Sequence, residues 1–240
     1  MINFTEYILE AITLTSQYHS ELNPNLWDDS TLKLEVKEHL LKISLAWAKF
    51  ANIKEKSIID IILVGGNANY NYTKYSDIDV HLILDKNEYG DEIEVFNDYF
   101  KDKQKIWNVL HNIKMYDHSV ELYALLEGSS SPTDQGVYSI LKNKWIQKPK
   151  HEKLLPDSID IQRKVEEYAH NIDHNISSNS SIEHILGIKK KLKNMRQAGL
   201  KHAGEFSIEN IVFKELRNLG YLEKINNYVN RKEDKELSLT

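Results

Sequence analysis

The sequence predicts an α/β (α+β) fold in which a mixed β-sheet is flanked by helices. Short, β-branched apolar runs at 58–64, 77–84 and 119–126 have the length and composition of buried strands. Segments with a helical spacing of apolar residues lie before and between them. From about residue 157 the spacing stays helical, which adds a C-terminal helical region to the sheet.

The part before the first strand predicts N-terminal helices. Apolar residues recur at helical spacing over 4–19 and more strongly over 31–51. Between these helices, the sequences Asn-Pro and Asp-Asp-Ser are typical of a loop. The first strand, 58–64, then ends at two glycines, Gly65 and Gly66.

Two more strands and one helix complete the predicted sheet region. Ten mostly polar residues separate the glycines from the second strand, 77–84. Asp91 fits an N-cap with Glu94 three residues later, which predicts a helix to about His111. The third strand, 119–126, follows and leads into the loop sequence GSSSPTDQG.

The C-terminal third predicts helices only, and caps and stops set their expected extents. We expect helices over about 159–174, from a capping box of Ser180 and Glu183 to about His202, after Ser207, and over Tyr221–Arg231. The tail after Arg231 is expected to fray. We therefore expect two domains: residues 1–156, with the N-terminal helices and the sheet core, and residues 157–240, packed on that core.

Composition limits the class of protein. With 41% hydrophobic and 28% charged residues, the 240-residue chain can bury a substantial core. The net charge of −5 excludes a global basic field, so any contact with nucleic acid needs a local patch. The absence of cysteine excludes disulfides and thiolate zinc sites. No signal peptide or spanning stretch is visible, and we expect a cytoplasmic protein without a membrane partner.

Asp77 and Asp79 stand in the second strand, although carboxylates are poor strand formers. Because side chains alternate along a strand, both acids point to one face, and Ile78 and Val80 point to the other. Two neighbouring carboxylates stay ionised together when a cation lies between them. Mg²⁺ fits best, because it takes one or two carboxylates together with phosphate oxygens. A calcium-binding loop is excluded, because the residues between the acids are apolar.

Gly65 and Gly66 supply a second half of the same site. Glycine lets the backbone approach a bulky anion, and a short helix that opens after it presents free N–H groups to phosphate. If the two strands pair, a phosphate held there lies close to a metal on Asp77 and Asp79. The combined pattern therefore favours a site that activates a triphosphate.

This succession of motifs resembles the polymerase β-like nucleotidyltransferase superfamily. The resemblance covers about residues 57–126 and rests on strand, Gly-Gly, ten residues and Asp-x-Asp, with a third carboxylate on a later strand. Glu121, between Val120 and Leu122, takes the third position, and Asp117 is its rival if the strand starts earlier. The layout of the chain is also similar to that of uncharacterised nucleotidyltransferase-like proteins of tailed bacteriophages.

The resemblance implies an enzyme with a two-metal-ion mechanism that uses Mg²⁺ or Mn²⁺ and a nucleoside triphosphate. It makes Asp77, Asp79 and Glu121 both the metal ligands and the catalytic residues, with Glu121 also available as general base. It makes Gly65 and Gly66 the residues that hold the β- and γ-phosphates.

Four further residues are candidates for substrate binding. Ser76 precedes the first aspartate and could touch phosphate. Lys189, Lys193 and Arg196 follow at i, i+4 and i+7 on a predicted helix and form one cationic stripe. In the superfamily that the chain resembles, a lysine from the helical region after the core often contacts the triphosphate. The stripe is therefore a candidate for phosphate or acceptor backbone, and otherwise it is a solvated face.

The expected activity is transfer of a nucleoside monophosphate from an NTP to a hydroxyl, with release of pyrophosphate. An RNA 3′ end is the first-choice acceptor, because the superfamily often acts there and the basic stripe could steer a phosphate backbone. A protein, a small molecule or a second nucleotide remain alternative acceptors, and the net charge argues mildly against a long nucleic-acid track. The alternative class is a nucleotide-binding module without catalysis.

Overall fold

The protein consists of two compact units in the computed structural model. Gln17–Lys153 form one, which we call the sheet unit. Met1–Ser16 together with Leu154–Thr240 form the other, which we call the helical unit. The structure describes residues 14–16, 18–89, 93–128, 135–150 and 158–239. Within these ranges, no helix is long and apolar enough to cross a membrane.

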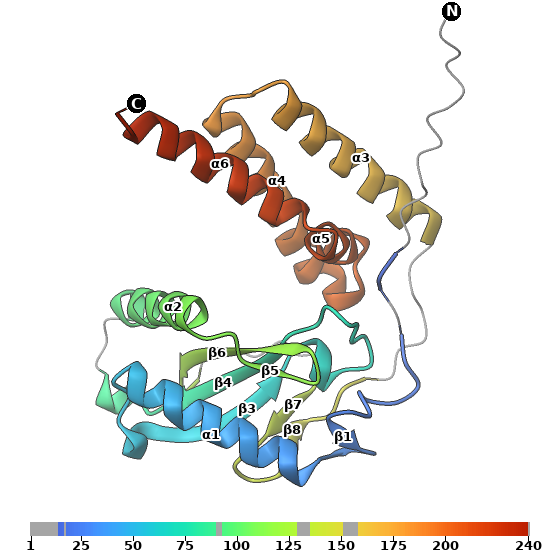
Figure 1. Ribbon diagram of the computed structural model, residues 1–240. Helices are drawn as coiled ribbons and strands as arrows, with labels where there is room; N and C mark the ends of the chain where they lie inside the picture. Colours follow the sequence, from blue (N-terminus) through green and yellow to red (C-terminus); the bar gives the residue numbers. More distant parts are fainter. Residues whose placement is uncertain (1–13, 17, 90–92, 129–134, 151–157, 240) are drawn as a thin grey trace, which may run out of the picture. The chain divides into compact units, whose positions relative to one another are not determined.

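A six-stranded mixed sheet organises the sheet unit, in the order β5-β6-β4-β3-β7-β8 (Figure 1). The three predicted strands are neighbours in it. β3 (Ile58–Val64) pairs antiparallel with β4 (Ile78–Leu84), and β4 pairs parallel with β6 (His118–Leu126). The shorter strands are β1 (Trp27–Asp28), β2 (Thr31–Leu32), β5 (Lys114–Met115), β7 (Val137–Ser139) and β8 (Lys144–Gln147). β1 and β2 form a separate two-stranded sheet.

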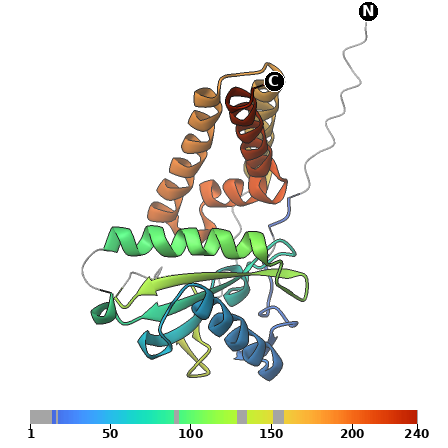
Figure 2. The same ribbon diagram turned by 60° about the vertical axis from the view of Figure 1, so that its left-hand side comes forward.

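Two helices, α1 (Leu34–Phe50) and α2 (Ile93–Leu110), flank the six-stranded sheet (Figure 2). Trp47 of α1 and Phe100 of α2 meet with ring centroids 6.4 Å apart. The strands add their buried aliphatic residues to the same core, namely Ile61, Leu63, Ile78, Val80, Leu82, Leu84, Val120 and Leu122. Single turns of 3₁₀ helix occur at Glu55–Ser57, Gly66–Ala68 and Lys86–Glu88.

Burial alternates strictly along β4 and β6. Every second residue, starting from Ile78 in β4 and His118 in β6, is buried, and the residues between are only half-buried. We call the side with the buried residues the core face. We call the other side, which carries Asp79 and Glu121, the acid face. The alternation predicted from the sequence is therefore confirmed for both strands.

Four helices of the helical unit pack around one core (Figure 1). They are α3 (Ser158–Ser177), α4 (Ile182–Ala203), α5 (Ile208–Asn218) and α6 (Tyr221–Leu237). A 3₁₀ turn, Gly204–Phe206, connects α4 to α5. As the sequence predicts, Ser207 caps α5, and its hydroxyl accepts a hydrogen bond from the Asn210 N–H at 3.3 Å.

Glu215 of α5 holds the N-terminal segment of the helical unit. Its side chain is completely buried, and its Oε2 accepts hydrogen bonds from the Thr15 N–H at 2.8 Å and the Thr15 hydroxyl at 3.0 Å. Its Oε1 accepts from the Ser16 N–H at 2.7 Å and from the Ser16 hydroxyl. The four donors offset the loss of water around this carboxylate. No sequence pattern predicts a contact between segments 200 residues apart.

Two predictions about helix ends are wrong. The cap of α4 is Ser181, whose hydroxyl accepts from the His184 N–H, and the Ser180 hydroxyl instead donates to Asn175. The last helix does not end near Arg231 but continues to Leu237, because the tail consists mostly of strong helix formers.

The other differences concern elements at the edges of the sheet unit and the N-terminus. The expected helix over 4–19 lies largely outside the described residues, and its described part carries no helix. The expected cap at Asp91 also lies outside them. The short strands β5, β7 and β8 were not predicted, because two to four residues are too few to show an alternating pattern.

Candidate active site

The glycine turn after β3 lies directly against Asp79. Gly65 has a φ of +75°, in the left-handed region that other residues rarely adopt. A Cβ placed on Gly65 would lie 1.9 Å from Asp79 Oδ2. The backbone conformation and the neighbouring carboxylate therefore both require glycine at this position. Gly66 then opens the single 3₁₀ turn Gly66–Ala68.

Two of the three predicted acids, Asp79 and Glu121, occupy neighbouring positions at one end of the acid face. Val64, Asp79 and Glu121 share one register position across β3, β4 and β6. Adjacent strands are about 4.8 Å apart, so Asp79 and Glu121 stand side by side. Asp77 lies just outside β4, two residues before Asp79 in the sequence. The predicted pairing between the strand that ends at the glycines, β3, and the strand that carries Asp79, β4, is present.

The next register position on the acid face carries His81 and Tyr123, whose rings make an edge contact at 5.0 Å. The Tyr123 hydroxyl donates a hydrogen bond to Glu121. Burial lowers the pKa of His81 to about 4, so its ring is neutral at neutral pH. Burial and then the charges of Glu121 and Asp79 raise the pKa of Tyr123, which therefore keeps its proton. This pair adds a hydrogen-bond donor beside the acids but no positive charge.

Ser76 connects the loop before β4 to the glycine turn. Its Oγ accepts a hydrogen bond from the Thr73 N–H at 2.9 Å. A Cβ placed on Gly66 would lie 2.9 Å from the same oxygen. The structure thus brings Ser76 beside the predicted phosphate turn, with a hydroxyl proton that can donate to an anion.

Asp117 is the rival for the third carboxylate, and it does not lie in a strand. It is exposed and occupies the two-residue turn between β5 and β6, with a φ of +67°. Glu121 is in β6 and in register with Asp79. The register therefore supports Glu121 as the third acid of the group.

The carboxylate oxygens at this end of the sheet are ligands of the kind that magnesium binds. Asp77 and Asp79 present carboxylate oxygens, which are hard ligands suited to Mg²⁺ or Mn²⁺. In the part of the chain that the structure describes, no three acidic or histidine side chains converge into a ligand cluster of their own. Mg²⁺ at phosphate sites needs only one or two protein carboxylates, because phosphate and water oxygens complete its shell. Asp79, which lies against the glycine turn, and Asp77, two residues before it, supply the two carboxylates of that smaller requirement.

The predicted cationic stripe lies on α4 in the helical unit. Lys189 donates to Asn226, and Arg196 donates to Asn210 Oδ1 at 3.1 Å. The Arg196 guanidinium also stacks over the Phe213 ring at 4.9 Å. Lys193 is exposed. Two of the three predicted cations thus have partners inside the helical unit, and Lys193 is the member with the most exposed position.

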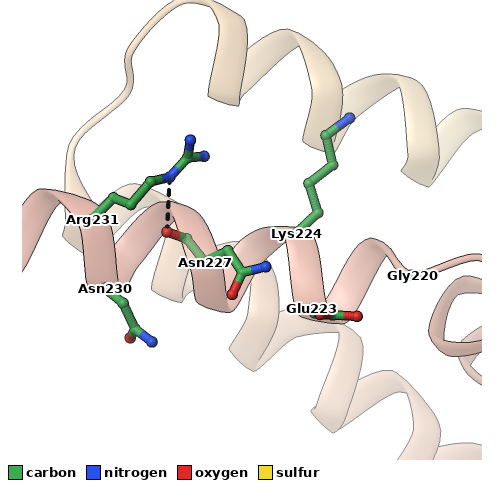
Figure 3. Close-up of a pocket in the computed structure, with 6 residues that line it drawn as sticks. All are labelled: Gly220, Glu223, Lys224, Asn227, Asn230 and Arg231. Carbon is green, nitrogen blue, oxygen red and sulfur yellow. Dashed lines mark hydrogen bonds between the residues drawn. The ribbon is translucent and has the colours of Figure 1, made fainter.

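A polar hollow of about 510 Å³ lies on α6 (Figure 3). Its described lining consists of Gly220, Glu223, Lys224, Asn227, Asn230 and Arg231. Lys224 pairs with Asp173, and the Arg231 Nε donates to the Asn227 carbonyl at 3.1 Å. The lining residues that the structure describes include none of the predicted site residues. We therefore assign the hollow no part in the site.

Two kinds of site residue were missed in the sequence. Tyr123 lies two residues after Glu121 in β6, so strand alternation alone would have placed it on the acid face. Asn67 and His118 form hydrogen bonds behind the acids. The sequence does not single out these two residues, because polar residues are common in the loops next to strands. Their role is visible only once the segments are paired.

The chain matches one protein family, described as nucleotidyltransferase domain, over residues 48–186. The match covers more than half of the chain and includes the glycine turn and all three acids. A search of curated proteins and a search of solved structures found no match.

Proposed function

Because this chain belongs to the family of nucleotidyltransferase domains, we propose that it transfers a nucleoside monophosphate from an NTP to a hydroxyl acceptor and releases pyrophosphate. The contact between the two halves of the site carries this proposal. The Asp79 carboxylate fills the space at Gly65 where a side chain would otherwise stand. A phosphate bound at the glycine turn is therefore held beside the acid.

In the proposed reaction, the acceptor oxygen forms a bond to the α-phosphorus. The bond between that phosphorus and the bridging oxygen breaks, and pyrophosphate leaves with its electron pair. Glu121 accepts the proton of the acceptor hydroxyl. Tyr123 orients Glu121 through its hydrogen bond, and its raised pKa keeps it a donor throughout.

Bound Mg²⁺ or Mn²⁺ would neutralise charge on the phosphates and lower the pKa of the attacking hydroxyl. Asp77 and Asp79 would hold the ions, with Glu121 as the third ligand. The backbone N–H groups at Gly65 and Gly66 would bind the β- and γ-phosphates, and Ser76 would donate to one of their oxygens. The chain contributes mainly by positioning these groups and excluding competing geometries.

We propose an RNA 3′ end as the acceptor, with Lys193 as the contact to its phosphate backbone. Lys189 and Arg196 already donate hydrogen bonds to Asn226 and Asn210 within the helical unit. Lys193→Gln should reduce the slope of log binding constant against log salt by about 0.7 for a single strand. Lys190→Gln is the control, because Lys190 is exposed on the same helix but outside the stripe. Equal slopes for the two variants would show that Lys193 does not contact the phosphate backbone and belongs to a solvated face of the helix.

One incubation series tests the proposed function. Each α-labelled NTP is mixed with Mg²⁺, the protein and a crude lysate, and the label is then located in RNA, protein or small molecules. We expect label at RNA 3′ ends and equal release of pyrophosphate, with Asp79→Asn as the inactive reference. Label in protein or small molecules keeps the reaction and replaces the acceptor. No incorporation from any of the NTPs contradicts the proposal.

A nucleotide-binding module without turnover is the second candidate. The observation that favours it is the absence of a three-residue ligand cluster among the described residues, with Glu121 bonded to Tyr123. Glu121→Ala separates the two. An enzyme has turnover that this variant loses while NTP binding remains. A binding module shows no turnover in the parent protein and unchanged NTP affinity in the variant.

A further inference from the structure

We propose that Asn67 is a positioning residue that holds the start of β4, and with it Asp77, at a fixed distance from the glycine turn. The inference rests on the proposed nucleotidyl transfer and adds residues that touch neither substrate nor metal. Asn67 lies in the 3₁₀ turn Gly66–Ala68, on the phosphate side of the site. Its side chain crosses from there to the backbone that carries the first acid.

The crossing consists of two hydrogen bonds from one amide. Asn67 Nδ2 donates to the Ser76 carbonyl at 3.2 Å and to the Asp77 carbonyl at 3.0 Å. Asn67 is completely buried, so water does not replace these bonds readily when they are lost. Its side chain therefore braces the two halves of the site against each other.

Neighbouring residues fix the direction of this amide. Asn23 Nδ2 donates to Asn67 Oδ1 at 2.9 Å, and Trp27 Nε1 donates to the Asn67 carbonyl at 2.8 Å. Because Oδ1 accepts from Asn23 and the Ser76 and Asp77 carbonyls can only accept, the amide nitrogen of Asn67 must face those two carbonyls. An isosteric aspartate would instead turn a carboxylate oxygen toward two carbonyls.

His118, at the start of β6, closes the network. Its Nδ1 donates to the Ser76 carbonyl at 2.7 Å, and its Nε2 accepts from Asn23 Nδ2 at 3.1 Å. A carbonyl only accepts and an amide nitrogen only donates, so these contacts select the neutral tautomer with the proton on Nδ1. The network thus joins β6, three residues before Glu121, to the backbone of Asp77.

The chemistry of the network suits this place. Asn23, Asn67 and His118 are buried and uncharged in these contacts. A lysine or arginine behind the acids would compete with the metal for them, whereas neutral amides hold the backbone and leave the carboxylates to the ion. Displacing a reacting group by about 1 Å can cost about 10²-fold in rate, so a brace of this kind has a measurable effect.

The test compares Asn67→Ala with Ser57→Ala, a matched control in the same unit. Ser57 is also completely buried and has two hydrogen bonds, to the Lys54 carbonyl at 2.7 Å and the Tyr89 hydroxyl at 3.0 Å. It lies next to the opposite end of β3 from Gly65. Both variants should lower Tm by about 5 °C. At a temperature where both are folded, Asn67→Ala should lower kcat at saturating NTP by about 30-fold or more, and Ser57→Ala by less than about twofold.

Binding of Mn²⁺ with a non-hydrolysable NTP gives a second readout that needs no turnover. Asn67→Ala should weaken this binding by about tenfold, Asn23→Ala should change it in the same direction, and Ser57→Ala should leave it unchanged. His118→Asn retains a donor close to the Nδ1 position, so it should keep more binding and more kcat than His118→Leu.

The outcomes separate this inference from the proposed function. If the protein transfers nucleotides but Asn67→Ala and Ser57→Ala have equal kcat and equal Mn²⁺ affinity, the positioning role is overturned. If no transfer occurs with any NTP, the proposed reaction fails, and the Mn²⁺ comparison still decides the positioning role. A parent protein that does not bind Mn²⁺ with the NTP analogue contradicts both.

Discussion

The two faces of the six-stranded sheet differ in the side chains that β4 and β6 place on them. On the core face, β4 and β6 place aliphatic side chains such as Val80 and Leu122, which are completely buried. One residue away on the acid face, the same strands place Asp79 and Glu121, which are half-buried. The period of two in a strand lets one segment serve the core and the site at the same time.

The comparison shows that the acid face is not an ordinary buried polar surface. Two buried acids elsewhere in the described residues have several donors: Glu215 accepts four hydrogen bonds, and Asp60 pairs with Lys142 at 2.8 Å and accepts from Ser139 at 2.7 Å. Glu121 is instead half-buried and shares its neighbourhood with a tyrosine and a neutral histidine. A substitution on the acid face should therefore lower activity and leave stability unchanged, whereas a substitution on the core face should lower stability and leave activity nearly unchanged.

The largest effect is expected on the acid face. Asp79→Asn should lower transfer by at least about 10³-fold, which corresponds to about 4 kcal/mol, because it removes a charge that, in the proposed reaction, would face the metal and phosphates. The melting temperature should stay within about 2 °C, since the variant relieves repulsion between neighbouring acids. Initial rates and a thermal melt on the same preparation measure both quantities. Wild-type activity in the variant would remove Asp79 from the mechanism.

The core face should show the reverse. Leu122→Ala removes a completely buried side chain next to Glu121 and should destabilise the protein by about 3 kcal/mol. Transfer per folded molecule should remain within about threefold, because the side chain points away from the acids. Urea denaturation gives the stability, and rates at low temperature give the activity. A specific loss of activity without loss of stability would break the division between the faces.

Gly65 tests the contact between the turn and Asp79. Gly65→Ala combines a left-handed backbone with an overlap on the Asp79 carboxylate, so it should cost about 2 kcal/mol and about tenfold or more in transfer. Gly128→Ala is the matched control, since Gly128 has a φ of +86° and open space at its Cβ position. The control should lose about 1 kcal/mol and no activity. Equal transfer rates in the two variants would show that the contact between Gly65 and Asp79 does not contribute to catalysis.

The smallest effect is expected at Tyr123. Tyr123→Phe removes the hydrogen bond to Glu121 and should lower transfer by about fivefold, or about 1 kcal/mol. Tyr138→Phe is the control on the core face, where the hydroxyl makes one long contact of 3.5 Å to the Leu32 N–H. kcat for both variants, measured side by side, decides whether Tyr123 orients the acid.

Strand alternation and glycine chemistry made the centre of the fold predictable. The strands 58–64, 77–84 and 119–126 correspond to β3, β4 and β6, and their pairing places Asp79 between Val64 and Glu121. The short strands β7 and β8 and the contact of Glu215 with Thr15 and Ser16 depend on distant segments. A local pattern has no means of encoding contacts of that range.

Some residues of the candidate site were not identified from the sequence, and for two of them the reason is again a contact between distant segments. Tyr123 was accessible to the alternation argument, because it lies two residues after Glu121. Asn67 and His118 are separated by about 50 residues in sequence, and both meet the Ser76 carbonyl. Only tertiary pairing brings their polar groups together, so composition and spacing could not identify them.

The most direct test of the acid face as a nucleotidyl-transfer site is equilibrium binding of Mn²⁺ in the presence of a non-hydrolysable NTP. The wild-type protein and the double variant Asp77→Asn/Asp79→Asn are compared by electron paramagnetic resonance, with thermal melts to confirm that both are folded. The account predicts NTP-dependent Mn²⁺ binding by the wild type and a loss of at least about 10²-fold in affinity in the variant. Equal Mn²⁺ affinity in the two proteins would contradict it.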